Sequence, residues 1–389
     1  MNGSEKEAQP TAEELARLRP ARSPWRKYAA VAAVSVVVVL LLAYGWTSGW
    51  FSPATESVTL VGAGATFPYP LISKWMSVYE NSTGVKVNYQ AIGSGGGISQ
   101  ITKKTVDFAG SDAPLNAAQR AGAQGLVHIP ETIGAVTFAY NLPGMATGLN
   151  VSGTVLAGIF LGNITAWNDA SIAALNPGVT LPSQPISVVH RSDGSGTTFV
   201  WTSFLSKENA TWKNDVGAGT SVNWPVGIGA PQNSGVAGKI QQTPYSAGYV
   251  ELAYTIQNSM TVAKVQNPAG SFVAPTLDSI KAAAQGAVST LPSGSGDWFN
   301  VSLIDAPGDT SYPIASFTYL LVYQHLEVIG SSMTQAKAQA LVKFLWWVIH
   351  DGQQYSEALV YVQLPSAVQS LNEATLGAIT FNGQAVPHS

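Results

Sequence analysis

The chain has 389 residues, of which 46% are hydrophobic and only 11% are charged, and its formal net charge at pH 7 is −3. An ordinary soluble protein has about 25% charged residues, so this surface is hydrated mainly by neutral polar side chains, which suits a protein outside the cytoplasm. The length predicts two domains plus additional segments, the lack of cysteine excludes disulfides, thiolate metal sites and catalytic thiols, and the main body has no Lys and Arg clusters of the kind that bind nucleic acid.

The N-terminal region predicts a membrane anchor over residues 28–50. The chain carries no charge from Tyr28 to Pro53, and its apolar part is close to the ~20 residues that a spanning helix needs. Five basic residues precede it, at Arg17, Arg19, Arg22, Arg26 and Lys27. By the positive-inside rule, residues 1–27 are a cytoplasmic basic segment, residues 51–57 are a tether, and the rest of the chain is extracellular.

The alternative is a cleaved signal peptide, whose apolar region has about 7 to 15 residues and ends in a small-residue cleavage site. Here the apolar run is longer and is followed by the bulky residues Trp46, Trp50 and Phe51. An uncleaved single-pass anchor at the cell membrane is therefore favoured.

Two strand–loop–helix units come next. A β-like segment at residues 58–61 leads into a glycine run at residues 62–66, and apolar residues then recur at helical spacing from Leu71 to Tyr79. The second unit has an alternating strand pattern at residues 85–89, a glycine run at residues 93–97 and a helical pattern at residues 98–105. A third short strand, at residues 106–109, ends at Gly110-Ser111-Asp112-Ala113-Pro114.

A fourth strand is expected at residues 186–190. It ends at Arg191, and a run of Gly, Ser and Thr at residues 192–197 separates it from a helix at residues 198–205. In α/β sheets, ligands collect at the carboxyl ends of strands. The four loops are therefore expected to face one crevice.

The β–α alternation continues through residues 135–140 and 154–168. A strand is expected at residues 317–323, and helices are expected at residues 335–349 and 353–359. Residues 345–349 are very apolar but too few to span a membrane, so we expect them in a buried core helix.

Together the loops predict a site for a small oxyanion. Removing such an anion from water requires many directed hydrogen-bond donors. The chain offers glycines that let peptide N–H groups approach, helix N-termini that favour negative charge, the planar charged fork of Arg191, and hydroxyls at Thr66, Ser94, Ser195 and Thr197.

Asp112 is the unexpected member, because a carboxylate repels an anion unless the anion carries a proton that the carboxylate can accept. Phosphate near neutral pH has such a proton and sulfate does not. Asp112 would therefore select phosphate by rejecting unprotonated anions.

Each feature also has a plainer interpretation. Glycine-rich loops are commonly turns, Arg191 and Asp193 can form a local ion pair, and Asp112 can end a turn or cap a helix. Ser195 lacks the G-x-S-x-G spacing of an activated nucleophile, and the five histidines are scattered without metal-ligand spacing. No catalytic residue, metal or cofactor is expected.

Four segments, in this order, resemble the signature segments of the phosphate-binding proteins of high-affinity phosphate ABC transporters. They are residues 59–68 (Thr-Leu-Val-Gly-Ala-Gly-Ala-Thr-Phe-Pro), 87–97 (Val-Asn-Tyr-Gln-Ala-Ile-Gly-Ser-Gly-Gly-Gly), 106–115 (Val-Asp-Phe-Ala-Gly-Ser-Asp-Ala-Pro-Leu) and 191–197 (Arg-Ser-Asp-Gly-Ser-Gly-Thr). The resemblance covers about residues 58–365.

The resemblance implies an α/β, two-lobed, class II periplasmic-binding-protein fold, in which each lobe is a mixed sheet flanked by helices. Lobe one would hold residues 58–133 and 313–389, and lobe two would hold residues 134–312. Ligand binding would bridge the lobes and close the cleft. The residues it assigns to phosphate are Thr66, Phe67 (through its backbone N–H), Ser94, Asp112, Arg191, Ser195, Gly196 and Thr197, with Asp193 bracing Arg191.

The implied function is an extracytoplasmic receptor that captures inorganic phosphate and delivers it to ABC permease subunits, as a monomer that performs no chemistry. The anchor departs from relatives that are free in a periplasm or lipid-tethered, so we expect a cell without an enclosed periplasm, such as an archaeon. The open alternatives are a secreted phosphatase-like enzyme, a surface adhesion or structural protein, and a receptor for another oxyanion such as sulfate or arsenate.

Overall fold

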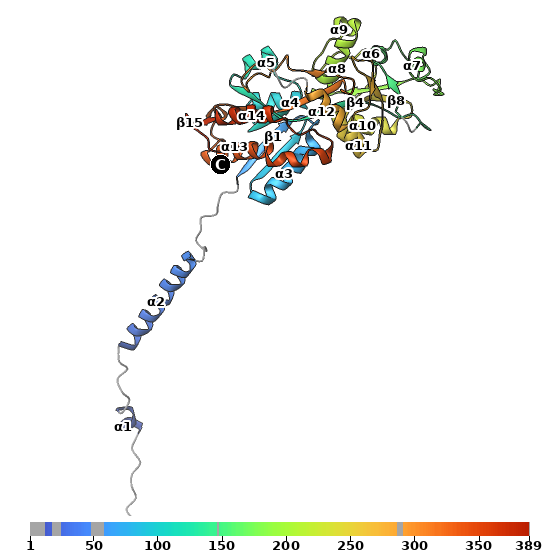
Figure 1. The fold of residues 1–389 in the computed structure, drawn as a ribbon. Coiled ribbons are helices and arrows are strands. Elements are labelled where there is room, and N and C mark those ends of the chain that lie inside the picture. Colours follow the sequence, from blue (N-terminus) through green and yellow to red (C-terminus); the bar gives the residue numbers. More distant parts are fainter. Residues whose placement is uncertain (1–11, 18–24, 48–57, 146–147, 286–290, 389) are drawn as a thin grey trace, which may run out of the picture. The chain divides into compact units, whose positions relative to one another are not determined.

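The computed structural model describes residues 12–17, 25–47, 58–145, 148–285 and 291–388 (Figure 1). The chain divides into two compact units, Met1–Glu56 and Ser57–Ser389. Each is described by itself below.

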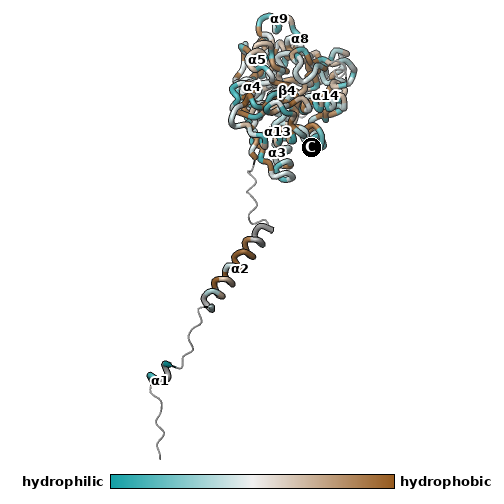
Figure 2. Tube along the Cα trace, turned by 90° about the vertical axis from the view of Figure 1, so that its left-hand side faces the viewer, coloured by the Kyte–Doolittle hydropathy of each residue, from teal (hydrophilic) through white to brown (hydrophobic). Residues whose placement is uncertain are grey.

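The unit Met1–Glu56 contains the helices α1 (Ala12–Arg17) and α2 (Trp25–Thr47). The side chains of residues 31–42 on α2 are exposed, and Figure 2 shows this part of the helix as predominantly hydrophobic. Among the residues that the structure describes, no helix is both long and apolar enough to cross a membrane. The anchor expected over residues 28–50 is thus not shown, and the tether expected over residues 51–57 lies outside the described residues.

In the described part of the unit Ser57–Ser389, ten strands form one mixed sheet (Figure 1). β12 (Leu303–Ile304) and β9 (Thr261–Val262) are side branches on β13 and β4. The other eight strands follow the order β2 (Lys86–Ala91), β1 (Thr59–Gly64), β3 (Phe108–Ser111), β13 (Ile314–Tyr323), β4 (Leu126–Tyr140), β8 (Ser246–Glu251), β6 (Ser187–Arg191) and β7 (Ile228–Ala230).

The sheet has two halves, one containing β1 to β3 and the other containing β6 to β8. The carboxyl ends of these strands in each half face the other half. β1 is parallel to β2 and β3, and β13 is antiparallel to both β3 and β4, so β4 runs in the direction of β1. β8 is antiparallel to β4, and β6 is parallel to β8 and β7. The carboxyl ends of β1 to β3 therefore point toward the half that contains β6 and β7, and the ends of β6 and β7 point back.

The long strand β4 connects the two halves. It pairs with β13 from Leu126 to Ala135 and with β8 from Val136 to Tyr140. All its residues are buried, as expected for a strand covered on both faces.

Helices pack against both halves of the sheet. α3 (Tyr69–Thr83), α4 (Ser94–Thr102) and α13 (Gln335–Ile349) contact strands among β1 to β3, and α8 (Gly196–Glu208), α10 (Gln232–Gln242) and α11 (Leu252–Gln257) contact β8. α12 (Leu277–Gln285) and α14 (Ser366–Gly377) contact β4. α6 (Gly153–Leu161) and α9 (Ala210–Asp215) contact α8, α7 (Ala170–Leu175) contacts β5 (Asn150–Val151), and α5 (Ala117–Gly122) follows β3 in the chain. Two further small sheets consist of β11 (Phe272–Val273), β10 (Lys264–Gln266) and β5, and of β14 (Thr380–Phe381) and β15 (Gln384–Ala385).

The expected core helix is confirmed, because α13 spans Gln335–Ile349 and buries Leu345, Val348 and Ile349. The helical stretch expected at residues 353–359 is present, but as 3-10 helix and not as α-helix. Two short 3-10 segments, η3 (Asp351–Tyr355) and η4 (Glu357–Leu359), occupy this stretch, and Val360 ends it with a left-handed backbone at φ 60°. The amide of Gln353 holds this turn by donating to the carbonyls of Glu131 and Val348.

The glycine run at residues 93–97 was expected to precede a helix, but the helix α4 begins inside it, at Ser94. A Cβ on Gly97 would lie 2.5 Å from the Gly64 Cα, and one on Gly95 would lie 3.0 Å from the Gly194 Cα. These glycines therefore allow backbones to approach closely, which outweighs their poor helix propensity.

Candidate functional site

The loop after β1 places Thr66 and Phe67 at the first turn before α3. Gly64 has φ +146°, and a Cβ there would lie 2.1 Å from the Gly110 carbonyl oxygen, so only glycine fits where β1 and β3 end. Thr66 and Phe67 are both buried. The ring of Phe67 packs beside Gly134, where a Cβ would approach it to 2.5 Å, so the side chain belongs to the core and only the backbone of Phe67 can contact a ligand.

Asp112 lies just beyond the end of β3 and is 1% exposed. Its Oδ1 accepts a hydrogen bond from Thr318 Oγ1 at 3.1 Å, and its Oδ2 lies 3.5 Å from Ser94 Oγ. Burial raises the pKa of Asp112 to about 7, although the hydrogen bond from Thr318 and the charge of Arg191 act in the opposite direction. This carboxyl is therefore poised to accept or hold a proton near neutral pH.

Arg191 ends β6 with its guanidinium buried at 1% exposure. Its Nε donates to Asp193 Oδ1 at 2.7 Å, a second guanidinium nitrogen donates to Asp193 Oδ2, and Nη1 donates to Thr197 Oγ1 at 3.3 Å. Burial alone would raise the pKa of Asp193, but the hydrogen bonds and charge of Arg191 outweigh it, so the pKa is lowered and Asp193 is ionised. Asp193 and Arg191 thus form an ion pair, and the bracing role that the resemblance implies for Asp193 stays a prediction.

Ser195, Gly196 and Thr197 form the N-terminus of α8. Ser195 is the N-cap, and its Oγ accepts the Thr198 N–H at 3.0 Å. The Gly196 N–H donates to Ser94 Oγ at 3.0 Å. The positive end of the α8 dipole therefore points at the place where Ser94 and Asp112 lie.

The two halves of the sheet touch directly at this place. Besides the bond from Gly196 to Ser94, the Gly95 N–H donates to the Gly194 carbonyl at 2.9 Å. The eight residues that the sequence predicts as ligands are all buried there and come from both halves.

Asn233 is a site residue that the sequence analysis did not single out. It is fully buried, and its Nδ2 donates to Thr66 Oγ1 and to Thr197 Oγ1, each at 3.0 Å, while its Oδ1 accepts the Glu251 N–H at 3.0 Å. Asn233 lies in the first turn of α10, directly after β7. The strand–loop–helix pattern that revealed the other loops could have pointed to it.

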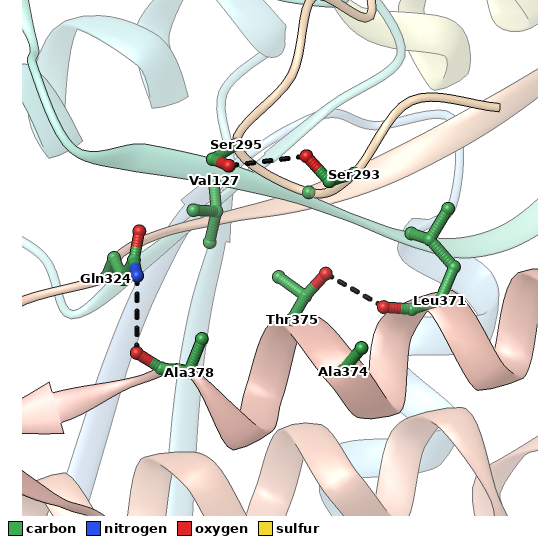
Figure 3. A pocket seen from close by; sticks show the side chains of 9 residues that line it. Val127, Ser293, Ser295, Gln324, Leu371, Ala374, Thr375 and Ala378 are labelled. Atoms are coloured by element: carbon green, nitrogen blue, oxygen red, sulfur yellow. Dashed lines mark hydrogen bonds between the residues drawn. The ribbon is translucent and has the colours of Figure 1, made fainter.

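Two cavities help to delimit the site. One of ≈ 300 Å³ reaches Asp112 and is also lined by Phe199, Ser316, Tyr319 and neighbouring residues. The other, of ≈ 320 Å³, lies between α14 and the loop containing Ser293 and Ser295, and its lining includes Val127 and Gln324 (Figure 3). None of the predicted ligand residues lines this second cavity, so it is not the oxyanion site.

Comparison with known proteins identifies the family. Residues 51–351 match the family model described as PBP superfamily domain. The chain is 46% identical over 319 residues to the phosphate-binding protein PstS of Pasteurella multocida, which covers 82% of this chain and 90% of that protein. The chain belongs to the PstS phosphate-binding protein family. It is also 38% identical over 333 residues to the PstS protein of Methanocaldococcus jannaschii, covering 81% of this chain and 85% of that protein.

Solved structures confirm the α/β periplasmic-binding-protein fold. A high affinity periplasmic phosphate-binding protein (PfluDING), bound with phosphate, aligns with a TM-score of 0.64 at 20% identity over 82% of this chain and 93% of its own. A DING protein aligns with a TM-score of 0.64 at 22% identity over 81% and 93%. The predicted PstS family is therefore confirmed, whereas an archaeal source stays a prediction, because the PstS relatives include both bacteria and an archaeon.

Proposed function

We propose that this chain is an extracytoplasmic receptor that captures inorganic phosphate between the two halves of its sheet and delivers it to an ABC permease. The observation that carries this proposal is that the loops after β1, β2 and β3 meet the Arg191 loop at one buried place, in a member of the PstS family. The relatives are named for phosphate binding, and a phosphate-bound protein shares the fold. These names describe binding, so a phosphatase is not favoured.

The site's geometry supports the binding residues that this proposal assigns. The backbone N–H of Phe67 and the hydroxyls of Thr66 and Ser94 would bind the anion from the β1 to β3 half. Arg191, the Gly196 N–H and the hydroxyls of Ser195 and Thr197 would bind it from the other half. Asp112 would accept the proton of the phosphate. An anion held by both halves would keep them together.

The lobe division belongs to the same proposal. Lobe one would hold residues 58–133 and 313–389, and lobe two would hold residues 134–312. β4 changes its pairing partner from β13 to β8 between Ala135 and Val136, which supports a passage of the chain from lobe one to lobe two near this point. Bending of β4 and β13 there would open the site.

Asp112→Asn is expected to narrow the preference for phosphate over sulfate by about tenfold or more, since a hydrogen bond to a charged group is worth about 1.5–3 kcal/mol. The new amide can donate to an unprotonated oxygen, whereas the carboxylate can only accept. Competition of sulfate against labelled phosphate measures this preference. Asp297→Asn, at an exposed carboxylate paired with Arg120, is the control and should leave it unchanged. If Asp112→Asn still excludes sulfate as strongly as the unaltered chain does, Asp112 does not select phosphate by accepting its proton.

We also propose that residues 28–50 hold the receptor at the cell membrane as a single-pass anchor, with the binding unit outside and acting as a monomer. The exposed side chains of residues 31–42, which are all apolar except Ser35, support this. Membrane fractions from cells that express the full chain should retain it after a high-salt wash, and a chain that begins at Ser57 should be recovered in the medium. A washed membrane free of the full chain would contradict the anchor.

A further inference from the structure

Glu131 is a buried acid that the binding site described above does not use. It lies on β4 with 0% exposure. Its Oε1 is 3.2 Å from Thr318 Oγ1, and its Oε2 has no hydrogen-bond partner among the described residues. Among these residues no Lys, Arg or His forms an ion pair with it. An ionised carboxylate without a cation is costly to bury.

The hydroxyl of Thr318 connects Glu131 to the phosphate site. Thr318 Oγ1 lies 3.1 Å from Asp112 Oδ1 as well as 3.2 Å from Glu131 Oε1. A hydroxyl carries one hydrogen, so it can donate to only one of these two oxygens. The other contact is a hydrogen bond only if that carboxyl is protonated and donates to Thr318. This chain of three groups therefore holds one carboxylic acid.

The surroundings indicate which carboxyl carries the proton. Burial raises the pKa of Asp112 to about 7, but the hydrogen bond from Thr318, the charge of Arg191 and the hydrogen bond from Ser94 all favour its ionised form. Glu131 has only the Thr318 contact; burial raises its pKa to about 8, and the charge of Asp112 acts in the same direction. Other titratable groups also interact electrostatically with this pair: Arg191, Glu251 and the tyrosines Tyr89, Tyr254, Tyr319 and Tyr361. Only Arg191 is cationic, and its charge acts on Asp112.

We propose that Glu131 is a positioning residue for phosphate selection: it stays protonated and donates to Thr318, which in turn donates to Asp112 Oδ1. This relay keeps Asp112 an acceptor. Its Oδ2 lies 3.5 Å from Ser94 Oγ and has a second lone pair that can accept the proton of the ligand. The inference rests on the proposed function, because it assumes that phosphate binds beside Asp112.

The relay couples phosphate binding to pH. Ionised Glu131 would place a second buried negative charge near Asp112 and the anion, so binding requires the protonated form. Because the pKa of Glu131 is raised, the protonated form prevails below that pKa, and affinity is lost as pH rises through it. Between about pH 8 and pH 10 inorganic phosphate keeps one proton, so the ligand does not change over this range.

Titration calorimetry of the full chain with inorganic phosphate, from about pH 7 to about pH 10, tests the relay. The unaltered chain should weaken by about tenfold per pH unit above the pKa of Glu131, as expected for one coupled proton. Glu131→Gln should have a flatter profile, since its amide N–H donates to Thr318 at every pH. Glu357→Gln, an exposed glutamate paired with Lys281, should keep the slope of the unaltered chain. An equal slope in Glu131→Gln would overturn the proposal.

A second measurement needs no variant and covers the case in which Glu131→Gln does not fold. Calorimetry of the unaltered chain at about pH 9 in two buffers of different ionisation enthalpy counts the protons exchanged. Uptake of about one proton per phosphate is expected, and an uptake of zero would overturn the relay while leaving phosphate binding intact.

Infrared spectroscopy of the phosphate-free chain near pH 7 separates the relay from the proposed function. A protonated-carboxyl band is expected to be weaker in Glu131→Gln, because Asp112 and Glu251 also have raised pKa values and can contribute to the band. A band of equal intensity in Glu131→Gln would overturn the relay whether or not phosphate binds. Failure to bind phosphate at any pH would refute the proposed function instead.

Discussion

Arg191→Ala is expected to weaken phosphate binding by about a hundredfold to a thousandfold. The guanidinium is 1% exposed and is bonded to both carboxylate oxygens of Asp193. Its removal would delete the charged donor that we propose for the anion and would leave Asp193 without its cationic partner. Breaking a fully buried ion pair from one side costs about 3–5 kcal/mol. The Asp193 side chain is 21% exposed, so solvent reduces this cost, and the loss of the proposed donor to the anion accounts for much of the weaker binding.

The matched control is Arg120→Ala. Arg120 also pairs with an aspartate, Asp297, but the two side chains are 32% and 47% exposed. Such exposed pairs contribute about 0–1 kcal/mol, so phosphate affinity should stay within measurement error. Thermal unfolding of Arg191→Ala without ligand shows whether the variant is folded. A folded Arg191→Ala chain with unaltered affinity would mean that the anion does not bind at Arg191.

Gly196→Ala is expected to weaken phosphate binding by about ten- to a hundredfold through steric hindrance alone. A Cβ at this position would lie 2.5 Å from both Asp112 Oδ2 and Ser94 Oγ. The two halves of the sheet could then approach only with a shift of the α8 N-terminus, and overpacking of this kind costs about 1–3 kcal/mol. Because the open form relieves the clash, the stability of the unliganded chain should change less than the affinity does. Titration calorimetry and thermal unfolding of the same preparation measure the two effects.

Gly238→Ala on α10 is the control for this steric effect. A Cβ on Gly238 would meet nothing within 4 Å, and alanine is favoured over glycine in a helix by about 0.5–1 kcal/mol. This variant should bind phosphate normally and be slightly more stable. Equal affinities of Gly196→Ala and Gly238→Ala would contradict the close approach of α8 to Asp112.

The strand–loop–helix units around the site could be predicted from the sequence because their signals are local. Apolar alternation marks β2, and the strand expected at residues 186–190 corresponds to β6 (Ser187–Arg191). The glycine runs after these strands marked where loops and helix N-termini would meet. The PstS family followed from the order of these segments, and the comparisons confirm it.

Other features depend on contacts between distant parts of the chain, which local patterns do not encode. Asn233 bonds to Thr66, 167 positions away, and Thr318 bonds to Asp112, 206 positions away. Glu131 lies where the register of β4 with β13 shifts, between the pairs Thr132–Thr318 and Pro130–Tyr319, and the sequence pattern does not reveal such an irregularity. The start of α4 at Ser94 depends on the close approach of Gly64 to Gly97, a contact that offsets the low helix propensity of the glycine run.

The central claim is that the buried site formed by Asp112, Arg191 and the α8 N-terminus binds phosphate, and that Asp112 accepts the proton of the bound phosphate. Titration calorimetry of the full chain, stripped of bound ligand, first with phosphate and then with sulfate, tests this claim most directly. The account predicts tight one-to-one binding of phosphate and no heat with sulfate. Equal binding of both anions, or no binding of either, would contradict it.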